Sequence, residues 1–236
     1  MDMQAGSIAD LPWTALLGFA GILYLAGIIH VTVMALAAFG FRTRIEEISF
    51  GLFTPIVSKR FANTQLSVRA FPFAGYVRMR QLAEQKKPFL HQDDGKQYFD
   101  QLPSTAKIII TISGCTALLG ISLILMGEQA FSAGFSIWVQ FLFGALGPFS
   151  TAQTHLGNLL DFIQATTVIS MIAVVFAKHA AMNLLPVGVQ NGGILLRILL
   201  EKSCSQTVVE RYLQVSTIVI LLIWLSWLVA IFYFFF

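Results

Sequence analysis

Long runs of apolar residues alternate with polar stretches along the chain. Four of these runs are long enough to cross a bilayer, since about 20 residues of helix span a hydrocarbon core of roughly 30 Å. They cover residues 11–41, 106–126, 162–186 and 213–236. A fifth run, residues 135–149, is shorter and contains Gly144, Gly147 and Pro148. We therefore expect an interfacial or re-entrant segment there rather than a span.

Residues 42–101 have no helical period. Apolar and polar residues alternate in the segments 45–51 and 66–71, which is typical of strands. We expect short strands that lie against the face of the membrane. The predicted fold is an all-α polytopic membrane protein with about four transmembrane helices and a small membrane-associated β element. We expect residues 1–236 to form one membrane domain, with 42–101 as a β-rich loop.

Composition supports the membrane class. The chain of 236 residues is 56% hydrophobic and only 11% charged, whereas soluble domains are about 25% charged. These values exclude a soluble globular enzyme and a disordered chain. Two cysteines, Cys115 and Cys204, do not make a disulfide framework. The net charge of +3 gives no reason to expect a nucleic-acid partner.

The basic residues predict the topology. Eleven of the 15 Lys and Arg residues lie between Arg42 and Lys107, and the other four lie between Lys178 and Arg211. The N-terminal tail, residues 127–161 and the C-terminal end carry none. The positive-inside rule assigns the basic segments to the cytoplasm. We expect an even number of spans in a bacterial inner membrane, with both termini outside.

Several short motifs occur in a recognisable order. Residues 28–34 read IIHVTVM late in the first span, and residues 48–55 read ISFGLFTP. Residues 71–79 read FPFAGYVRM, and residues 183–193 read NLLPVGVQNGG. This series resembles the site-2 protease family of intramembrane zinc metalloproteases, whose members carry H-E-x-x-H, F-x-x-G-F-G-P, P-x-G-G-Y-V and N-x-x-P-x-P-x-L-D-G-G in that order. The family's G-P-x-x-N element retains only its glycine here, Gly114.

The departures from the family pattern concern the zinc site. The resemblance implies three metal ligands and a glutamate base. Only the first ligand, His30, is present: the base position is Val31, the second ligand is Met34, and the aspartate of L-D-G is Asn191. A single imidazole cannot hold catalytic zinc, and valine cannot accept a proton. We predict that catalysis is lost and that no metal or other cofactor is bound, which makes the chain a pseudoprotease with a vestigial active site.

Other residues leave alternatives open. His179 and Asn183 lie four residues apart on one helical face after Lys178, and His30 with His179 could form a replacement metal site. Otherwise we expect His30 to be a buried histidine that is hydrogen-bonded to a backbone carbonyl or to Asn183. Lys178 and His179 then make structural hydrogen bonds, or the lysine snorkels to the interface. Asn183 and Pro186 resemble the family's substrate-contacting turn, but they are also typical of a helix end.

The segments 45–51 and 71–79 match the membrane-associated β elements of the family pattern. The second of these segments contains Phe71, Pro72, Gly75, Tyr76 and Val77, and in the family such a strand is thought to receive a substrate strand. Strand addition uses main-chain hydrogen bonds, which survive changes of side chain. The alternative is that these strands merely close the floor of the helix bundle.

These observations predict a binding protein rather than an enzyme. We expect a catalytically inactive scaffold or assembly subunit that holds a partner's transmembrane segment in a larger membrane complex, in contact with lipids. Many family members carry a PDZ domain between the second and third spans, but only about 35 residues are present here, at 127–161, too few for such a domain. The competing hypothesis is an active metalloprotease with non-standard ligands. A channel or carrier is disfavoured because the spans contain few ionisable groups and no duplicated half.

Overall fold

The computed structural model describes residues 12–81, 95–188, 190–201 and 203–236. Seven α-helices and one β-hairpin make up this part of the chain, and they confirm the predicted fold class. In chain order the elements are α1 (Trp13–Gly40), β1 (Ile45–Phe61), β2 (Thr64–Met79), the 3₁₀ turn η3 (Phe99–Gln101), α2 (Ser104–Met126), α3 (Gln129–Leu146), α4 (Thr151–Ala165), α5 (Val168–Asn183), α6 (Asn191–Leu200) and α7 (Gln206–Phe235).

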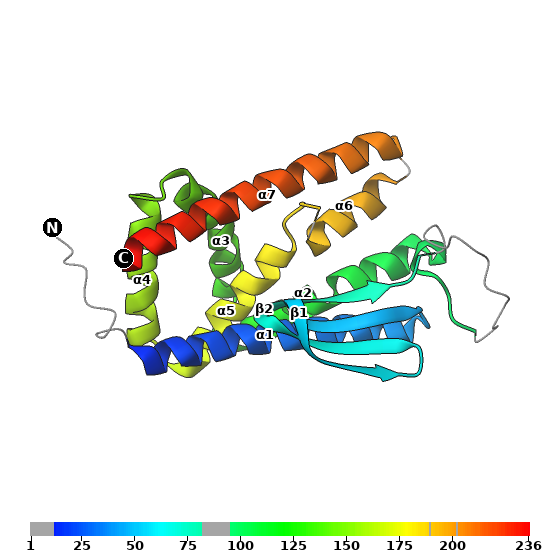
Figure 1. Cartoon of the computed structure of the whole chain (residues 1–236), viewed down its shortest axis with the longest axis horizontal. Coiled ribbons are helices and arrows are strands. Elements are labelled where there is room, and N and C mark those ends of the chain that lie inside the picture. The colour runs from blue at the N-terminus through cyan, green and yellow to red at the C-terminus, as the bar shows by residue number, and fades with distance from the viewer. Residues whose placement is uncertain (1–11, 82–94, 189, 202) are drawn as a thin grey trace.

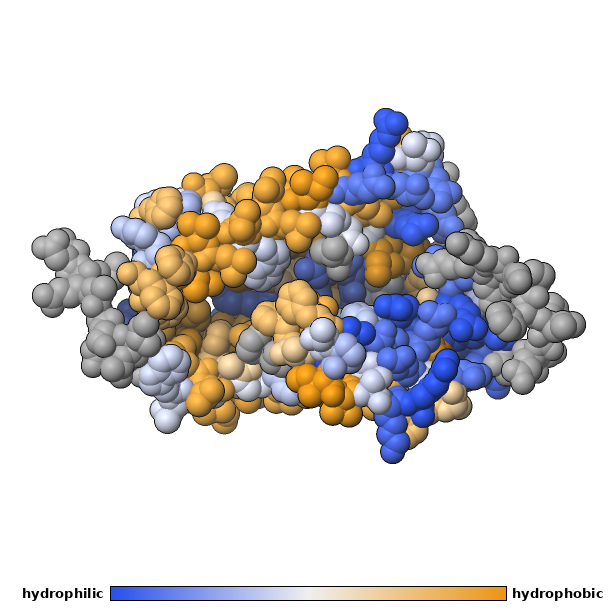
Figure 2. All heavy atoms as spheres, viewed as in Figure 1, coloured by the Kyte–Doolittle hydropathy of each residue, from blue (hydrophilic) through white to orange (hydrophobic). Residues whose placement is uncertain are grey.

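Helices α1 and α7 run along the long axis of the molecule, and the start of α1 and the end of α7 lie at the same end of it (Figure 1). Helix α4 runs crosswise at that end. The β-hairpin lies toward the opposite end, where hydrophilic residues gather, while apolar residues cover most of the rest of the visible face (Figure 2). The molecule therefore has an apolar body and one polar end that contains the hairpin, an arrangement that suits a protein embedded in a bilayer.

The helices differ from the predicted spans in two places. Four described helices are long and apolar enough to cross a membrane, namely α1, α2, α3 and α7. The expected span 162–186 is wrong, because it is divided between the end of α4 and the 16-residue α5. Thr167 begins α5 by accepting a hydrogen bond from the Ser170 amide, as an N-cap does. At 1.5 Å per residue α5 is only about 24 Å long.

The fifth apolar run is also more regular than expected. Instead of a short re-entrant piece over 135–149, the chain forms the 18-residue α3, which begins at Gln129. The helix ends at Leu146, and Gly147 and Pro148 make the turn into α4. Helix α3 packs against α7: the Trp227 indole donates to the carbonyl of Phe141 at 2.9 Å, and the Ser226 hydroxyl donates to that of Ala145 at 2.6 Å. These contacts fix the last helix onto the bundle.

The β element consists of two long strands rather than the short strands expected. β1 and β2 have 17 and 16 residues and pair as one antiparallel sheet. Both strands bend: Ile48 pairs with Val77 near the end of β2 and also with Leu66 near its beginning. The bend in β1 coincides with Gly51 and Phe53, which have φ of 106° and 66°. A residue in this left-handed region kinks a strand and interrupts its register.

The bent hairpin encloses a polar cluster around Glu47, whose side chain is almost completely buried. Its carboxylate accepts hydrogen bonds from Arg69 Nη2 at 2.6 Å, the Ser67 hydroxyl at 2.9 Å and the Tyr76 hydroxyl at 3.0 Å. Burial alone raises the pKa of the Glu47 carboxyl, but these hydrogen bonds and the charge of Arg69 outweigh burial and hold the pKa below the usual glutamate range. The cluster joins the two strands by ionic hydrogen bonds.

Helix α1 connects two apolar clusters. Its first half packs with α2 and α5 around Ile22, Ala26 and Phe176. Its second half packs against the hairpin and the start of α2 around Met34, Ala38, Val77 and Ile110. His30 lies on α1 between the two clusters and is the centre of the candidate site.

Candidate functional site

His30 is buried on α1, where α2 passes very close to it. Only 3% of its surface is exposed. A Cβ atom added to Gly114 of α2 would lie 2.5 Å from the His30 carbonyl oxygen and 2.7 Å from its Nδ1, which is closer than packed atoms approach. Gly114, the glycine kept from the G-P-x-x-N element, therefore permits the contact between the two helices. The imidazole lies inside the helix bundle, with one ring nitrogen facing α2.

Asn191, the first residue of α6, closes the other side of His30. Its amide nitrogen Nδ2 lies 3.1 Å from His30 Nε2 and 2.9 Å from the backbone oxygen of Thr111 on α2. A carbonyl oxygen can only accept a hydrogen bond, so the Thr111 oxygen requires the NH₂ end of the amide to face inward. The second N–H then donates to Nε2, which must be unprotonated. His30 is therefore a neutral histidine with its proton on Nδ1, and its Nε2 lone pair is occupied by an amide hydrogen.

Met34 and Cys115 complete the surroundings of the His30 ring. The Met34 sulfur lies 3.8 Å from Asn191 Nδ2, one helical turn beyond His30 on the same face of α1. The Cys115 sulfur lies 4.0 Å from His30 Nδ1, where a thiol can serve as a weak acceptor. Each ring nitrogen of His30 thus faces a side chain from a different helix.

Val31 is sealed beneath the hairpin. The residue is fully buried, and a Cβ added to Gly75 of β2 would lie 2.8 Å from Val31 Cγ2 and 2.5 Å from the Ser49 carbonyl oxygen. Glycine at position 75 therefore allows β2 to pack directly on the side chain that follows His30. The position where the family pattern has a general base is occupied by a methyl group in contact with a strand.

His179 is near His30, but Asn183 and Pro186 make other contacts. The ring centroids of His30 and His179 lie 5.9 Å apart in an edge-to-face arrangement. Asn183 Nδ2 donates to the His179 carbonyl of its own helix at 3.0 Å, and the Pro186 carbonyl accepts from Tyr212 of α7 at 2.9 Å. The expected hydrogen bond between His30 and Asn183 is therefore wrong, since the amide that bonds to His30 is Asn191.

Lys178 makes a structural hydrogen bond rather than extending to the interface. Its Nζ donates to Gln140 Oε1 of α3 at 2.5 Å. This bond joins α5 to α3 and is one of the two alternatives that the sequence left open. The lysine is therefore part of the contact between these helices.

The predicted binding segment of the β element is paired and partly buried. Tyr76 lies opposite Ser49 and donates to Glu47, while Val77 lies opposite Ile48 and packs on α1. Phe71 is 41% exposed and its ring meets that of Phe53 edge to face. Pro72 belongs to the same strand. The segment thus contributes a buried face toward α1 and an exposed apolar part near its bend.

The residues around His30 do not fit the zinc site that the family resemblance implies. A catalytic zinc site needs three protein ligands and an open position for water. Of the expected ligand positions only His30 has a side chain that suits zinc, and its Nε2 accepts a hydrogen bond from Asn191. Across the ranges that the structure describes, no three His, Cys, Asp or Glu side chains are placed to hold one ion together.

Two features of the site were not visible in the sequence. The backbone oxygen of Thr111 orients Asn191, but a main-chain acceptor has no sequence signal. The polar cluster of Glu47 and Arg69 supports the strand above Val31. The sequence placed Glu47 in a segment that alternates apolar and polar residues, and this pattern does not show which face of the strand is buried.

Comparison with known proteins agrees with the resemblance seen in the sequence. The model of Peptidase family M50 matches residues 18–226, a range that includes His30, the hairpin and Asn191. A search of curated proteins finds no match to this chain.

Proposed function

Because the chain belongs to peptidase family M50, the site-2 protease family, we propose that it is a catalytically inactive member that acts as a binding or scaffold subunit. In this role it holds the transmembrane segment of a partner within a larger membrane complex. The observation that carries the proposal is the hydrogen bond from Asn191 to His30 Nε2. The nitrogen that would bind a metal instead accepts a hydrogen bond from an amide that also donates to the Thr111 carbonyl of α2.

The neighbouring positions support loss of catalysis. Hydrolysis requires a group that takes a proton from water, and Val31 can do neither this nor bind metal. The side chain is also fully buried and is covered by β2 at Gly75. Met34 offers a thioether, which is a soft ligand that suits copper(I) better than zinc.

Zinc content tests this part of the proposal. We expect the purified protein to contain far less than one zinc per chain after incubation with zinc, and to leave a model transmembrane substrate intact. His30→Ala should behave in the same way, and His155→Ala on α4 is the matched control for loss of a histidine elsewhere. The competing metalloprotease with His30 and His179 as ligands requires the opposite result: near-stoichiometric zinc and cleavage, both abolished by His30→Ala and kept by His155→Ala.

The binding role is supported by the apolar surface outside the closed site. Helix α7 exposes large apolar side chains along most of its length, among them Leu221, Leu225, Leu228 and Phe232. Part of this surface contacts lipid, as it does in any membrane protein. A long helix that contacts the bundle on one face leaves its other face available to a second helix. In a membrane, contacts between two such helices are stabilised by packing rather than by the hydrophobic effect.

Site-specific photocrosslinking distinguishes a partner from lipid. A crosslinking residue is placed at Leu225 of α7, at Phe71 of the hairpin and, as a control, at Ile124 of α2, which is 85% exposed. We expect one protein to crosslink from one of the first two positions and not from Ile124. A crosslink from Phe71 would identify the strand as the binding element. Protein that is recovered only as a free monomer, with lipid adducts from all three positions, would contradict the scaffold role.

We also propose that both termini face the outside of a bacterial inner membrane. The start of α1 and the end of α7 lie at one end of the molecule, away from the polar end that contains the hairpin (Figures 1 and 2). A C-terminal alkaline phosphatase fusion should be active and a C-terminal green fluorescent protein fusion dark; the reverse result would place the C-terminus in the cytoplasm.

A further inference from the structure

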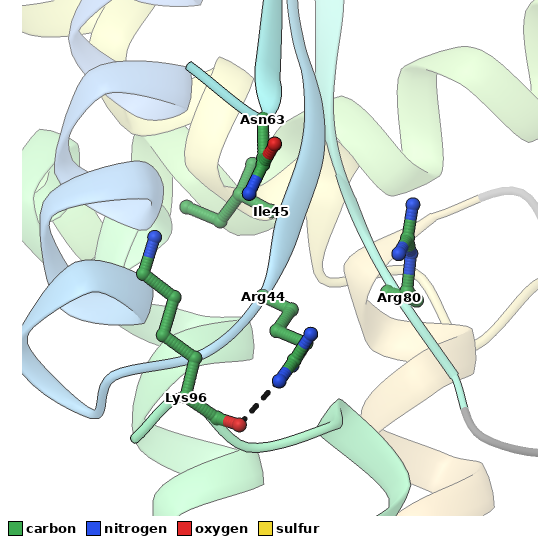
Figure 3. A pocket seen from close by; sticks show the side chains of 5 residues that line it. All are labelled: Arg44, Ile45, Asn63, Arg80 and Lys96. Carbon is green, nitrogen blue, oxygen red and sulfur yellow. Dashed lines mark hydrogen bonds between the residues drawn. The ribbon is translucent and has the colours of Figure 1, made fainter. Parts of the chain in front are cut away.

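A cavity lined by three basic side chains lies where α1 leads into the hairpin. Its walls are formed by Arg44, Ile45, Asn63, Arg80 and Lys96, and the small space between them is partly open to solvent (Figure 3). The side chains come from separate parts of the chain: the start of β1, the turn between the strands, the end of β2 and the segment before η3. The fold therefore assembles this cationic site from residues that are distant in sequence.

The backbone around the cavity is fixed by hydrogen bonds. The Arg44 amide donates to the Gln97 carbonyl at 2.9 Å, and the Arg80 amide donates to the Arg44 carbonyl at 2.9 Å. The turn that carries Asn63 is held against β1, because the Thr64 hydroxyl donates to the Ile45 carbonyl at 3.0 Å. The Cα positions of the lining residues are thus set by the sheet and not by the side chains themselves.

Two of the basic side chains are also oriented by their neighbours. Arg44 donates through Nε to the Lys96 carbonyl at 3.1 Å (Figure 3) and lies over the Tyr98 ring at 5.1 Å. Arg80 forms an ion pair with Glu46, in which Nε donates to Oε1 at 2.8 Å, so Glu46 offsets part of the positive charge at this side of the cavity. A guanidinium that is held at Nε keeps a defined direction for its two terminal nitrogens, and this preorganisation favours binding of an anion with several oxygens.

The position of the cavity indicates the kind of anion. Arg44 lies four residues after Gly40, the last residue of a helix long enough to cross the membrane. The cavity therefore lies at the polar end of the molecule, just beyond the end of a candidate membrane span, and lipid phosphates lie at the ends of membrane spans. We propose that Arg44, Arg80, Lys96 and Asn63 form a binding site for a phosphate group, supplied either by the headgroup of an anionic lipid or by free phosphate.

The test compares charge removal inside and outside the cavity. The protein is placed in nanodiscs of phosphatidylcholine with or without phosphatidylglycerol, and retained lipids are counted by native mass spectrometry. Arg44→Gln with Arg80→Gln removes two charges from the cavity. Lys59→Gln with Arg60→Gln removes two charges from the hairpin outside it. General attraction to an anionic surface weakens by roughly fivefold for each charge removed, wherever the charge lies.

A built site predicts different results for the two pairs. We expect phosphatidylglycerol retention to fall at least tenfold more in the cavity pair than in the hairpin pair. Asn63→Ala keeps every charge and should still reduce retention several-fold, because the amide is a direct donor. Equal loss in the two pairs, or no effect of Asn63→Ala, would overturn the proposal. Thermal unfolding of each variant in lipid-free detergent confirms that it is folded, and Asn63→Ala carries the test if the arginine pair is unstable.

Inorganic phosphate distinguishes the two sources. In detergent without anionic lipid, the melting temperature is measured against phosphate concentration for the parent chain and Asn63→Ala. A rise that Asn63→Ala removes identifies free phosphate as a ligand of this site. No rise, together with lipid retention that depends on the cavity residues, identifies the headgroup. Failure of both measurements contradicts the site. None of these outcomes depends on whether the chain is catalytically inactive.

Discussion

Asn191→Asp is the substitution that most directly tests the geometry around His30. In the family pattern an aspartate at this position is a metal ligand, so the change restores the family's residue. In this structure, however, the amide is a donor to two acceptors, the Thr111 carbonyl at 2.9 Å and His30 Nε2 at 3.1 Å. A carboxylate has no hydrogen to donate. We therefore expect the family's own residue to destabilise this chain.

The magnitude follows from the contacts. Hydrogen bonds between helices in a membrane contribute about 0.6 kcal/mol each on average and up to about 1.7. Asn191→Ala removes two such bonds and should cost about 1–3 kcal/mol. Asn191→Asp also places a negative oxygen against two acceptors, and a buried charge without a partner costs about 3–5 kcal/mol. The aspartate variant should thus be the less stable of the two.

The assay measures reversible unfolding in mild detergent. Tryptophan fluorescence monitors the unfolding, and a chelator is present throughout. Asn183→Asp is the matched control. The Asn183 side-chain amide also donates to a carbonyl, but this is the His179 carbonyl of the same helix, α5. A carboxylate near a helix C-terminus costs about 0.3–1 kcal/mol. The penalty of Asn191→Asp should shrink as the pH falls, since an added proton supplies the missing donor. If Asn191→Asp were as stable as the parent at neutral pH, the assignment of the Asn191 amide as the donor to His30 would be wrong.

Two further substitutions test the hairpin. Gly75→Ala should lower the free energy of unfolding by about 1–3 kcal/mol through overpacking. Val31→Ala in the same chain should recover part of this loss, because one of the two close contacts of the new methyl group is with Val31 Cγ2. If the losses of the two single variants simply add in the double variant, this contact is contradicted. Glu47 has a pKa below the usual glutamate value of 4.5, so its stabilising effect is complete above about pH 4.5 and is lost as the pH falls through its lower folded value. Glu47→Gln should therefore lower the melting temperature at pH 7, and the gap in melting temperature between the variant and the parent should be smaller at pH 3. An equal gap at both pH values would argue against an ionised Glu47 carboxylate.

The sequence predicted the elements whose signal is strong over many residues. The helices α1 and α2 begin and end within two residues of the expected spans, because apolar runs of this length have no other stable state in a bilayer. The break between α4 and α5 was missed, since Thr166 and Thr167 interrupt an apolar run without a charge or a proline. Their hydroxyls can cap a helix as readily as they can continue one.

The candidate site was predicted only in part: Asn183 and Pro186 make other contacts, and Thr111 and Cys115 were not expected. The order of motifs gave a reason to expect His30 and Asn191 in one site, and the two side chains are in contact. It could not indicate that the amide nitrogen faces the imidazole, because that orientation depends on the backbone of Thr111. The burial of Glu47 was missed for a similar reason. The bend of β1 turns the face that contains Glu47 and Ser49 inward, and alternation alone does not say which face becomes the interior.

The replaced positions form a packed and hydrogen-bonded interior, and this supports a fold that is kept for binding. A site that had lost ligands without other change would leave unpaired polar groups or space around them. Here Asn191 hydrogen-bonds to His30, and Val31 fills the space beneath Gly75. Among the buried side-chain polar atoms that the structure describes, the hydroxyl of Thr43 lacks a hydrogen-bond partner, and it lies outside this site. The two glycines that permit close packing, Gly75 and Gly114, are both kept at positions where the family pattern has glycine. The packing geometry therefore survives where the catalytic side chains do not, as expected if the shape of the bundle, rather than its chemistry, is what a partner recognises.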